Sequence, residues 1–199
     1  MLQARHSMEE NRSTSRSPHA RGGPLSPISS SPMTAHEMFQ KMSPDLGQTI
    51  IGWLRESERA VFRTALNSLA QQRKLRPVFV TRKPKPEQAA WLVEQLKMRG
   101  NEAVGENLLQ IWLMKGRSPM LSSFLDSLGV SHDGKGGIDG DIPKELDPAK
   151  VKAGATALLE QFPAPEVAVY LNLFQLQQPG GWPQITEVIE SDARLAVGG

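Results

Sequence analysis

Apolar residues recur along residues 43–196 with the three- and four-residue spacing of amphipathic helices. Two stripes show this spacing most clearly: Val61, Phe62, Ala65, Leu66 and Leu69, and Val151, Ala155, Leu158, Leu159 and Phe162. Such spacing places the apolar side chains on one helix face, where they can pack against neighbouring helices. The pattern predicts an all-α domain of about seven helices in a compact bundle-like or helical-hairpin array.

Helix start signals divide this domain. Ser43 precedes Pro44 and Asp147 precedes Pro148, and a capping residue followed by proline is typical of a first helical turn. Ser57 is a further candidate cap. The predicted helices cover residues 44–54, 57–69, 86–99, 102–115, 121–128, 148–162, 166–177 and 183–189, of which the first two can also be continuous.

One short segment favours a strand. Val78, Phe79 and Val80 are β-branched or aromatic, which suits a strand, but no second segment offers a partner. We therefore expect at most one short strand near 77–81, with an extended connector as the alternative. Residues 82–86 are expected to be extended, because a residue that precedes proline is displaced from the helical conformation.

The helix predicted over 166–177 is apolar on almost every side. A helix of this kind is either buried among others or lies at an interface. We expect it to provide a surface for a partner or for self-association, provided that it is not wholly core.

Composition changes before this helical pattern and once within it. Residues 1–36 contain eight Ser and four Pro and few apolar residues, so they cannot bury enough surface to fold, and we expect a disordered Ser/Pro/Arg-rich tail. The helical domain then spans 43–196. A Gly- and Asp-rich loop after residue 129 can divide it into halves, 43–129 and 147–196.

Two segments of the chain resemble each other. Pro84–Leu92 and Pro163–Leu171 are identical at five of nine positions. Duplication of a helical hairpin would give this similarity. Repeated use of Pro-x-Pro-Glu as a helix start would give it as well.

Charge is distributed unevenly. The formal net charge is +2 at pH 7. Residues 59–85 nevertheless contain eight basic side chains and no acidic one, whereas the rest of 37–199 has 11 basic and 19 acidic side chains. This asymmetry can steer a charged partner, or the charges can pair within the protein.

The densest part of the basic segment is a candidate nucleic-acid site. Cations for phosphates, with aromatic rings for base stacking, are the means by which proteins bind single strands. The candidate binding residues are Arg73, Lys74, Arg76, Phe79, Arg82, Lys83, Lys85 and Trp91. The same residues suit a helix C-terminus, a solvated linker, the protein's own acidic faces or an acidic protein partner.

The loop over residues 130–142 carries two partial motifs. Gly129–Gly136 matches a phosphate-binding loop except at Gly136, where Ser or Thr must hold magnesium, and it follows a helix instead of a strand. A calcium loop that starts at Asp133 lacks oxygen ligands at Lys135, Gly137 and Lys144. We expect no metal and no cofactor here.

No catalytic residue can be assigned, and the sequence favours a protein that is not an enzyme. It contains no cysteine, which excludes disulfides and thiolate sites, and three of its four histidines lie in the tail. It also lacks an apolar run of about 18 to 20 residues and a secretory signal. We expect a cytoplasmic protein without a membrane partner.

Three runs, Leu108–Leu113, Met120–Gly134 and Val167–Leu171, resemble a pattern in helical bacterial proteins of similar size to which no function is assigned. The resemblance covers roughly residues 50–180. It implies a bacterial, cytoplasmic protein and transfers no site residue.

The leading hypothesis is a non-enzymatic helical binding or scaffold protein that acts through protein–protein contacts. Nucleic-acid binding through residues 73–85 is the alternative. An enzyme with the 130–142 loop in its site comes third, and no small-molecule substrate can be identified.

Overall fold

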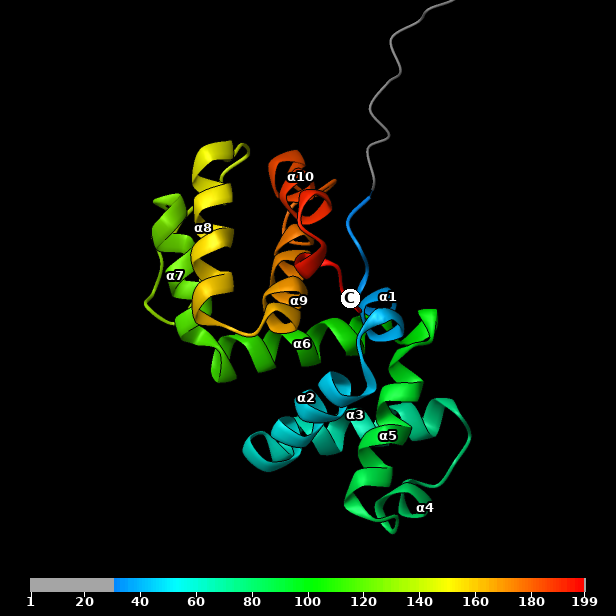
Figure 1. Cartoon of the computed structure of the whole chain (residues 1–199). Coiled ribbons are helices and arrows are strands. Elements are labelled where there is room, and N and C mark those ends of the chain that lie inside the picture. The colour runs from blue at the N-terminus through cyan, green and yellow to red at the C-terminus, as the bar shows by residue number, and fades with distance from the viewer. Residues whose placement is uncertain (1–30, 199) are drawn as a thin grey trace, which may run out of the picture.

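A computed structural model describes residues 31–198 and shows an all-α fold (Figure 1), which confirms the predicted class. Within the described residues there are ten α-helices and two 3-10 turns, more than the predicted number of about seven. The helices are α1 (Ala35–Lys41), α2 (Pro44–Ser57), α3 (Arg59–Gln72), α4 (Pro77–Thr81), α5 (Lys85–Leu96), α6 (Glu102–Gly116), α7 (Ser118–Leu128), α8 (Pro148–Gln161), α9 (Ala164–Gln175) and α10 (Pro183–Ser191). The 3-10 turns are η1 (Arg99–Asn101) and η2 (Ala193–Leu195).

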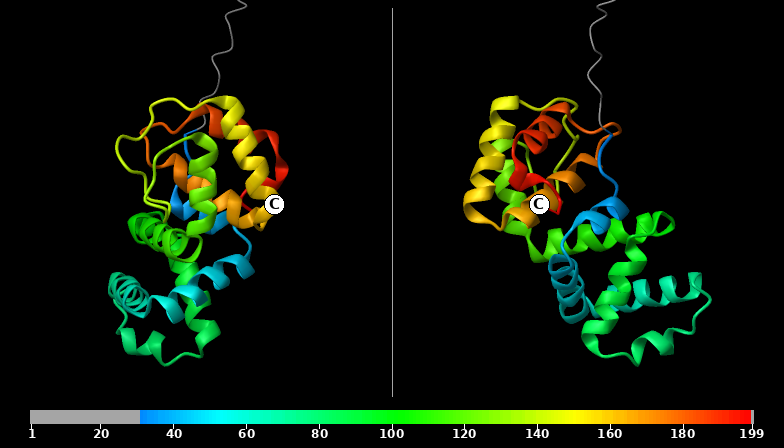
Figure 2. Two further views of the ribbon diagram at one scale, coloured as in Figure 1. Left: turned by 90° about the vertical axis from the view of Figure 1, so that its left-hand side faces the viewer. Right: turned by 45° about the vertical axis from the view of Figure 1, so that its right-hand side comes forward.

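Helix α6 crosses the middle of the molecule and joins two lobes (Figures 1 and 2). The α2–α5 lobe lies on one side of α6, and the α7–α10 lobe lies on the other. Helix α1 packs against α6, and the C-terminal end returns to α1. The buried apolar residues of both lobes form one continuous core.

Several predicted helix starts are confirmed. Ser43 Oγ accepts a hydrogen bond from the Leu46 amide at 3.2 Å, and Asp147 Oδ1 accepts one from the Ala149 amide at 2.9 Å. Each bond satisfies one of the amides that the first helical turn leaves without a partner. Ser57 is not a cap, because it is the last residue of α2 and Glu58 precedes α3.

Helix α1 was not predicted. Ala35 and His36, the last residues of the expected tail, belong to it and are buried. Thr34 and Glu37 form a capping box, and Met38 and Phe39 supply the buried face. A helix of two turns is too short for the apolar spacing to stand out in the sequence. The expectation of disorder over residues 1–30 falls outside the described residues.

Residues 77–81 form neither the short strand nor the extended connector expected there, because they fold into the short helix α4. Pro77 takes the first helical position, which its fixed φ favours, and Val80 is buried against the lobe. The described chain offers no strand to pair with, so local helical hydrogen bonds satisfy the backbone. Residues 82–86 are likewise not fully extended, since Lys85 begins α5 although Pro86 follows it.

Apart from its first two residues, helix α9 lies in the core. Every residue from Glu166 to Gln175 is buried, including Leu173, which is 6% exposed. Tyr170 and Phe174 pack edge-to-face against Phe124 of α7, with ring centroids 5.6 and 5.7 Å away. Burial raises the pKa of Tyr170 far above its usual range. The all-apolar helix is therefore explained by packing and offers no surface to a partner.

The segments of internal similarity begin their helices in the same way. Pro84 and Pro163 take the cap positions of α5 and α9, and Pro86 and Pro165 follow in the first turn. The helices themselves differ, because α5 buries one face and α9 is buried on all sides.

In the part of the chain that the structure describes, no helix combines the length and apolar character that a bilayer-spanning segment needs.

Candidate functional site

The turn between α3 and α4, together with α4, carries a surface that is both cationic and apolar. Its apolar side chains are unusually open: Leu75 is 41% exposed, Val78 42% and Phe79 61%. We define the α4 surface as these three residues with the exposed cations around them, Arg73, Lys74, Arg76 and Arg82. Leaving apolar side chains in water costs free energy, so we take this cluster as a candidate contact surface.

The backbone at the start of the α4 surface holds an unusual conformation. Lys74 has a φ of 55°, the left-handed region that L-residues other than glycine enter at a cost of about 1 kcal/mol. Lys74 follows Arg73, the residue that caps the end of α3, and the Leu75 amide donates to the Ala70 carbonyl at 2.9 Å. This helix end turns the chain sharply and carries Leu75 and Arg76 to the surface.

Most cations of the basic segment have no acidic partner among residues 31–198. Of the eight basic residues in 59–85, only Lys83 forms an ion pair within the described residues, with Glu87 at 3.2 Å. The interpretation that the basic segment pairs with the protein's own acidic faces is therefore wrong for the other seven.

The structure places the predicted binding residues in four settings. Arg73, Lys74, Arg76, Phe79 and Arg82 belong to the α4 surface. Lys83 is paired with Glu87, and Trp91 is half-buried against the core, where it cannot act as an open stacking platform. Lys85 faces a separate cleft.

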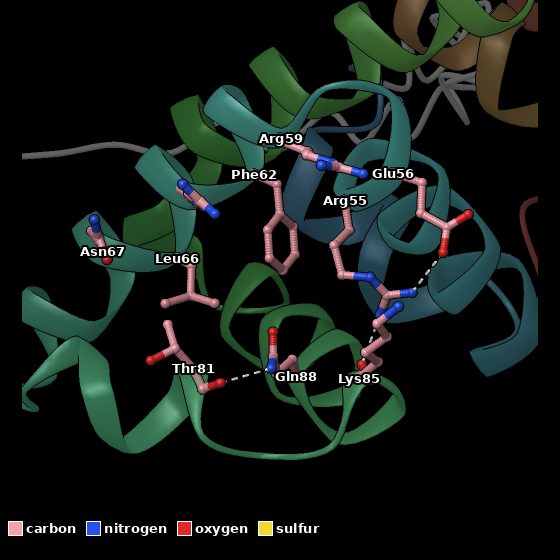
Figure 3. A pocket seen from close by; sticks show the side chains of 10 residues that line it. Arg55, Glu56, Arg59, Phe62, Leu66, Asn67, Thr81, Lys85 and Gln88 are labelled. Carbon is pink, nitrogen blue, oxygen red and sulfur yellow. Dashed lines mark hydrogen bonds and ion pairs between the residues drawn. The ribbon is translucent and has the colours of Figure 1, made fainter.

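That cleft lies between the end of α2, one face of α3 and the α4–α5 connection (Figure 3), and its volume is about 350 Å³. Phe62 points from α3 into it, and the nearly buried Phe62 and Leu66 form an apolar floor. The remaining lining residues are charged or polar: Arg55, Glu56, Arg59, Arg63, Asn67, Thr81, Lys85 and Gln88. We call it the arginine cleft.

Arg55 is fixed within the arginine cleft. Its Nη1 donates to the Lys85 carbonyl at 3.0 Å and its Nη2 to Glu56 Oε1 at 3.2 Å. The first bond ties the end of α2 to the first residue of α5. Gln88 Nε2 donates to the carbonyls of Thr81 and Lys83 at 3.0 and 2.7 Å, which holds the α4–α5 connection in place.

The arginine cleft was missed at the level of sequence, although part of its signal is visible there. Arg55, Arg59, Arg63 and Asn67 are spaced by four residues, and Arg59 and Arg63 must therefore share one face of α3. The sequence does not predict that the cleft also brings Lys85, Thr81 and Gln88 to that face.

The Gly-rich loop 130–142 has a structural explanation. His132 and Ile138 form an antiparallel bridge, and Asp133 Oδ1 accepts from the Lys135 and Gly137 amides at 2.7 and 2.9 Å. These backbone bonds hold the pKa of the Asp133 carboxyl below its usual range. The amides that would hold a phosphate are thus occupied by the loop's own carboxylate, which removes the support for a nucleotide site.

His132 belongs to the same closed loop. Its Nδ1 accepts from the Gly134 amide at 3.1 Å, so the proton lies on Nε2, which faces Asp126 Oδ1 at 3.0 Å. Among the described residues there is no group of three or more His, Asp and Glu side chains that could hold a metal ion.

Comparisons of the chain with protein-family models, with curated proteins and with solved structures find no match.

Proposed function

We propose that this protein is a binding protein that recognises a partner protein through the α4 surface, and that the recognised element is an acidic segment bearing apolar side chains. The observation that supports this proposal is the exposure of Leu75, Val78 and Phe79 among cations that have no partner within the described residues. The other large apolar side chains that are exposed among the described residues, Met98, Met114 and Ile142, are far apart in the sequence.

The two kinds of side chain in the α4 surface would contribute differently. Burial of the exposed part of Leu75, Val78 and Phe79 would supply most of the affinity, at about 25 cal/mol per Å² of apolar area. The cations would steer an acidic partner and raise the association rate, an effect that falls with salt. A partner that is acidic without apolar side chains would therefore bind weakly.

Single-stranded nucleic acid is the second candidate, and Phe79 favours it. A ring that is 61% exposed beside Arg76 and Arg82 provides one stacking platform next to cations. Leu75 and Val78 are aliphatic and have no ring to stack on a base. Trp91, the other aromatic predicted for this role, is half-buried. A protein partner uses all three exposed apolar side chains and is therefore the better fit.

The test compares three labelled probes of equal negative charge by fluorescence anisotropy at low and moderate salt. They are a short peptide that alternates Glu with Leu and Phe, a peptide of Glu and Gly, and a single-stranded oligonucleotide. The proposal expects the apolar acidic peptide to bind most tightly. The Phe79→Ala variant should weaken that peptide by roughly five- to tenfold, with little effect on the Glu/Gly peptide.

Matched variants separate recognition from general charge attraction. Met114→Ala removes an apolar side chain of similar exposure on α6, and Lys152→Glu reverses a charge on α8. Neither should change peptide binding, whereas Arg73→Glu with Arg76→Glu should abolish it. If the oligonucleotide binds most tightly and loses affinity in Phe79→Ala, the nucleic-acid candidate replaces the proposal. Equal binding of all three probes would mean attraction by net charge alone.

A further inference from the structure

We propose that the arginine cleft binds a small phosphate monoester, with its phosphate between Arg59 and Arg63 and its organic group over Phe62 and Leu66. This site is separate from the α4 surface and does not depend on the function proposed for it. Arg59 and Arg63 of α3 line the cleft together with Lys85, the first residue of α5. Figure 3 shows Arg59 and Lys85 among the side chains around it.

The charge of the cleft favours a doubly charged ligand. Its lining contains four cations and one carboxylate, Glu56, and that carboxylate already accepts from Arg55. Arg59, Arg63 and Lys85 make no side-chain ion pair within the described residues. A phosphate monoester carries about −1.5 to −2 charges at pH 7 and offers three acceptor oxygens, which a single carboxylate cannot match.

The positions of the two free arginines suit one phosphate group. Residues four apart on a helix have their Cβ atoms about 6 Å apart, so the guanidinium groups of Arg59 and Arg63 can converge on one anion. Each guanidinium presents a planar fork that donates two parallel hydrogen bonds to phosphate oxygens. Lys85 adds a third cation from the opposite wall.

The walls of the cleft are held before any ligand arrives. Arg55 is only 19% exposed at its side chain, and its bonds to the Lys85 carbonyl and to Glu56 connect α2 with α5. Gln88 fixes the α4–α5 connection from the other side. A site whose walls are already ordered loses less conformational entropy on binding.

The floor and the size of the cleft limit the organic part of the ligand. Phe62 is 5% and Leu66 1% exposed, so a small apolar area faces the opening. The volume of about 350 Å³ lies at the lower end of small-molecule sites. A sugar phosphate, an aryl phosphate or a mononucleotide has this size, and a dinucleotide exceeds it.

The experiment measures the thermal stability of the full chain with inorganic phosphate, phenyl phosphate and adenosine 5′-monophosphate, with phenol and adenosine as uncharged counterparts. A ligand that binds only the folded state raises the melting temperature, and at equal concentration a tighter ligand raises it more. We expect millimolar phenyl phosphate or adenosine 5′-monophosphate to raise it, and phenol and adenosine to leave it unchanged. Isothermal titration then gives the affinities.

Two variants locate the effect. Arg59→Gln with Arg63→Gln should weaken the monoesters by roughly tenfold or more. Arg99→Gln with Lys152→Gln removes the same charge outside the cleft and should leave their affinity unchanged. Circular dichroism confirms that both variants fold. Equal weakening in the two variants, or the absence of stabilisation by any phosphate, would overturn the site.

Two further comparisons sharpen the outcome. Inorganic phosphate that binds as tightly as the monoesters would overturn the role given to Phe62 and Leu66. Binding of the acidic apolar peptide to the Arg59→Gln/Arg63→Gln variant tests the two sites separately. Loss of phosphate binding with peptide binding retained would concern the arginine cleft alone. Loss of peptide binding to the α4 surface with phosphate binding retained would concern the α4 surface alone.

Discussion

Arg117 and Glu166 form a two-bond ion pair that ties the junction of α6 and α7 to the first turn of α9. Arg117 Nε donates to Glu166 Oε2 at 2.6 Å and its Nη2 to Oε1 at 2.7 Å, and the guanidinium lies over the Trp112 ring at 5.3 Å. The hydrogen bonds to Glu166 raise the pKa of Arg117 above its usual value. Because the pair joins segments far apart in sequence, it braces the α7–α10 lobe against α6.

Replacement of Glu166 by Gln should destabilise the protein markedly. The side chain of Glu166 is 9% exposed and that of Arg117 28%, so the arginine would lose its counter-charge in a partly dry setting. We expect a loss of about 2 kcal/mol, less than for a fully buried pair because Arg117 keeps some contact with water. Urea denaturation followed by tryptophan fluorescence measures it.

The exposed pair between Lys83 and Glu87 is the matched control. These side chains are 44% and 57% exposed, and such pairs contribute less than about 0.5 kcal/mol. Glu87→Gln should therefore leave the midpoint of denaturation nearly unchanged. Equal effects of Glu166→Gln and Glu87→Gln would show that the brace does not contribute to stability.

Gly136 should not tolerate a side chain. Its φ is 92°, and a Cβ atom at this position would lie 2.4 Å from Leu121 Cβ. Gly136→Ala therefore combines an unfavourable backbone conformation with a steric clash against α7. We expect it to cost about 2 to 3 kcal/mol in thermal or urea unfolding.

Gly134 separates the cost of the backbone conformation from the cost of the steric clash. It also has a positive φ, 73°, but nothing lies within 4 Å of the place where its Cβ would be. Gly134→Ala should cost only about 1 kcal/mol, the price of the left-handed conformation. Should the two variants prove equally stable, the packing of the loop against Leu121 would have to be revised.

The Asp133 carboxylate should make the 130–142 loop sensitive to acid. The Lys135 and Gly137 amides lower its pKa, so its contribution to loop stability is present above the ordinary aspartate pKa, about pH 4. That contribution is lost as pH falls through the lower pKa of the folded state. The amide resonances of Lys135 and Gly137 should accordingly titrate below about pH 4 in NMR spectra.

The Asp133→Asn variant isolates the charge. Its side-chain oxygen can still accept from the two amides, but it has no proton to gain, and their titration should disappear. Asp141→Asn, at an exposed position of the same loop, should leave the titration in place. Persistence of the titration in Asp133→Asn would assign it to another group.

The sequence predicts most of the long helices, because their starts and stripes are local properties. Ser43, Asp147 and Pro183 begin helices as expected, and Gly129 ends α7 with a φ of 72°. The short helices α1 and α4 could not be predicted in this way. Their apolar residues acquire a buried side only from the helices around them, and at α4 that packing overrides the strand preference of valine and phenylalanine.

The candidate sites could be predicted only in part, because their residues are brought together by tertiary packing. The charge of segment 59–85 is visible in the sequence, but which cations meet across space is not. Lys85 was grouped with Arg82, whereas the fold turns it towards Arg55 in the arginine cleft. The exposure of Phe79 and the half-burial of Trp91 depend on tertiary packing, so two aromatic residues with similar sequence surroundings differ in what they can bind.

Replacement by Glu should strongly destabilise the protein at Leu173 and leave its stability nearly unchanged at Phe79. Leu173 is 6% exposed inside α9, and Leu173→Glu would bury a carboxylate without a partner. We expect it to lower the free energy of unfolding by more than about 3 kcal/mol and to unfold much of the protein at 37 °C. Phe79→Glu places the charge in water and should change stability by less than about 0.5 kcal/mol. Circular dichroism melting curves of the two variants make the comparison. A folded Leu173→Glu protein with an altered association state would return α9 to the surface, and an unfolded Phe79→Glu protein would place Phe79 in the core and remove it from the α4 surface.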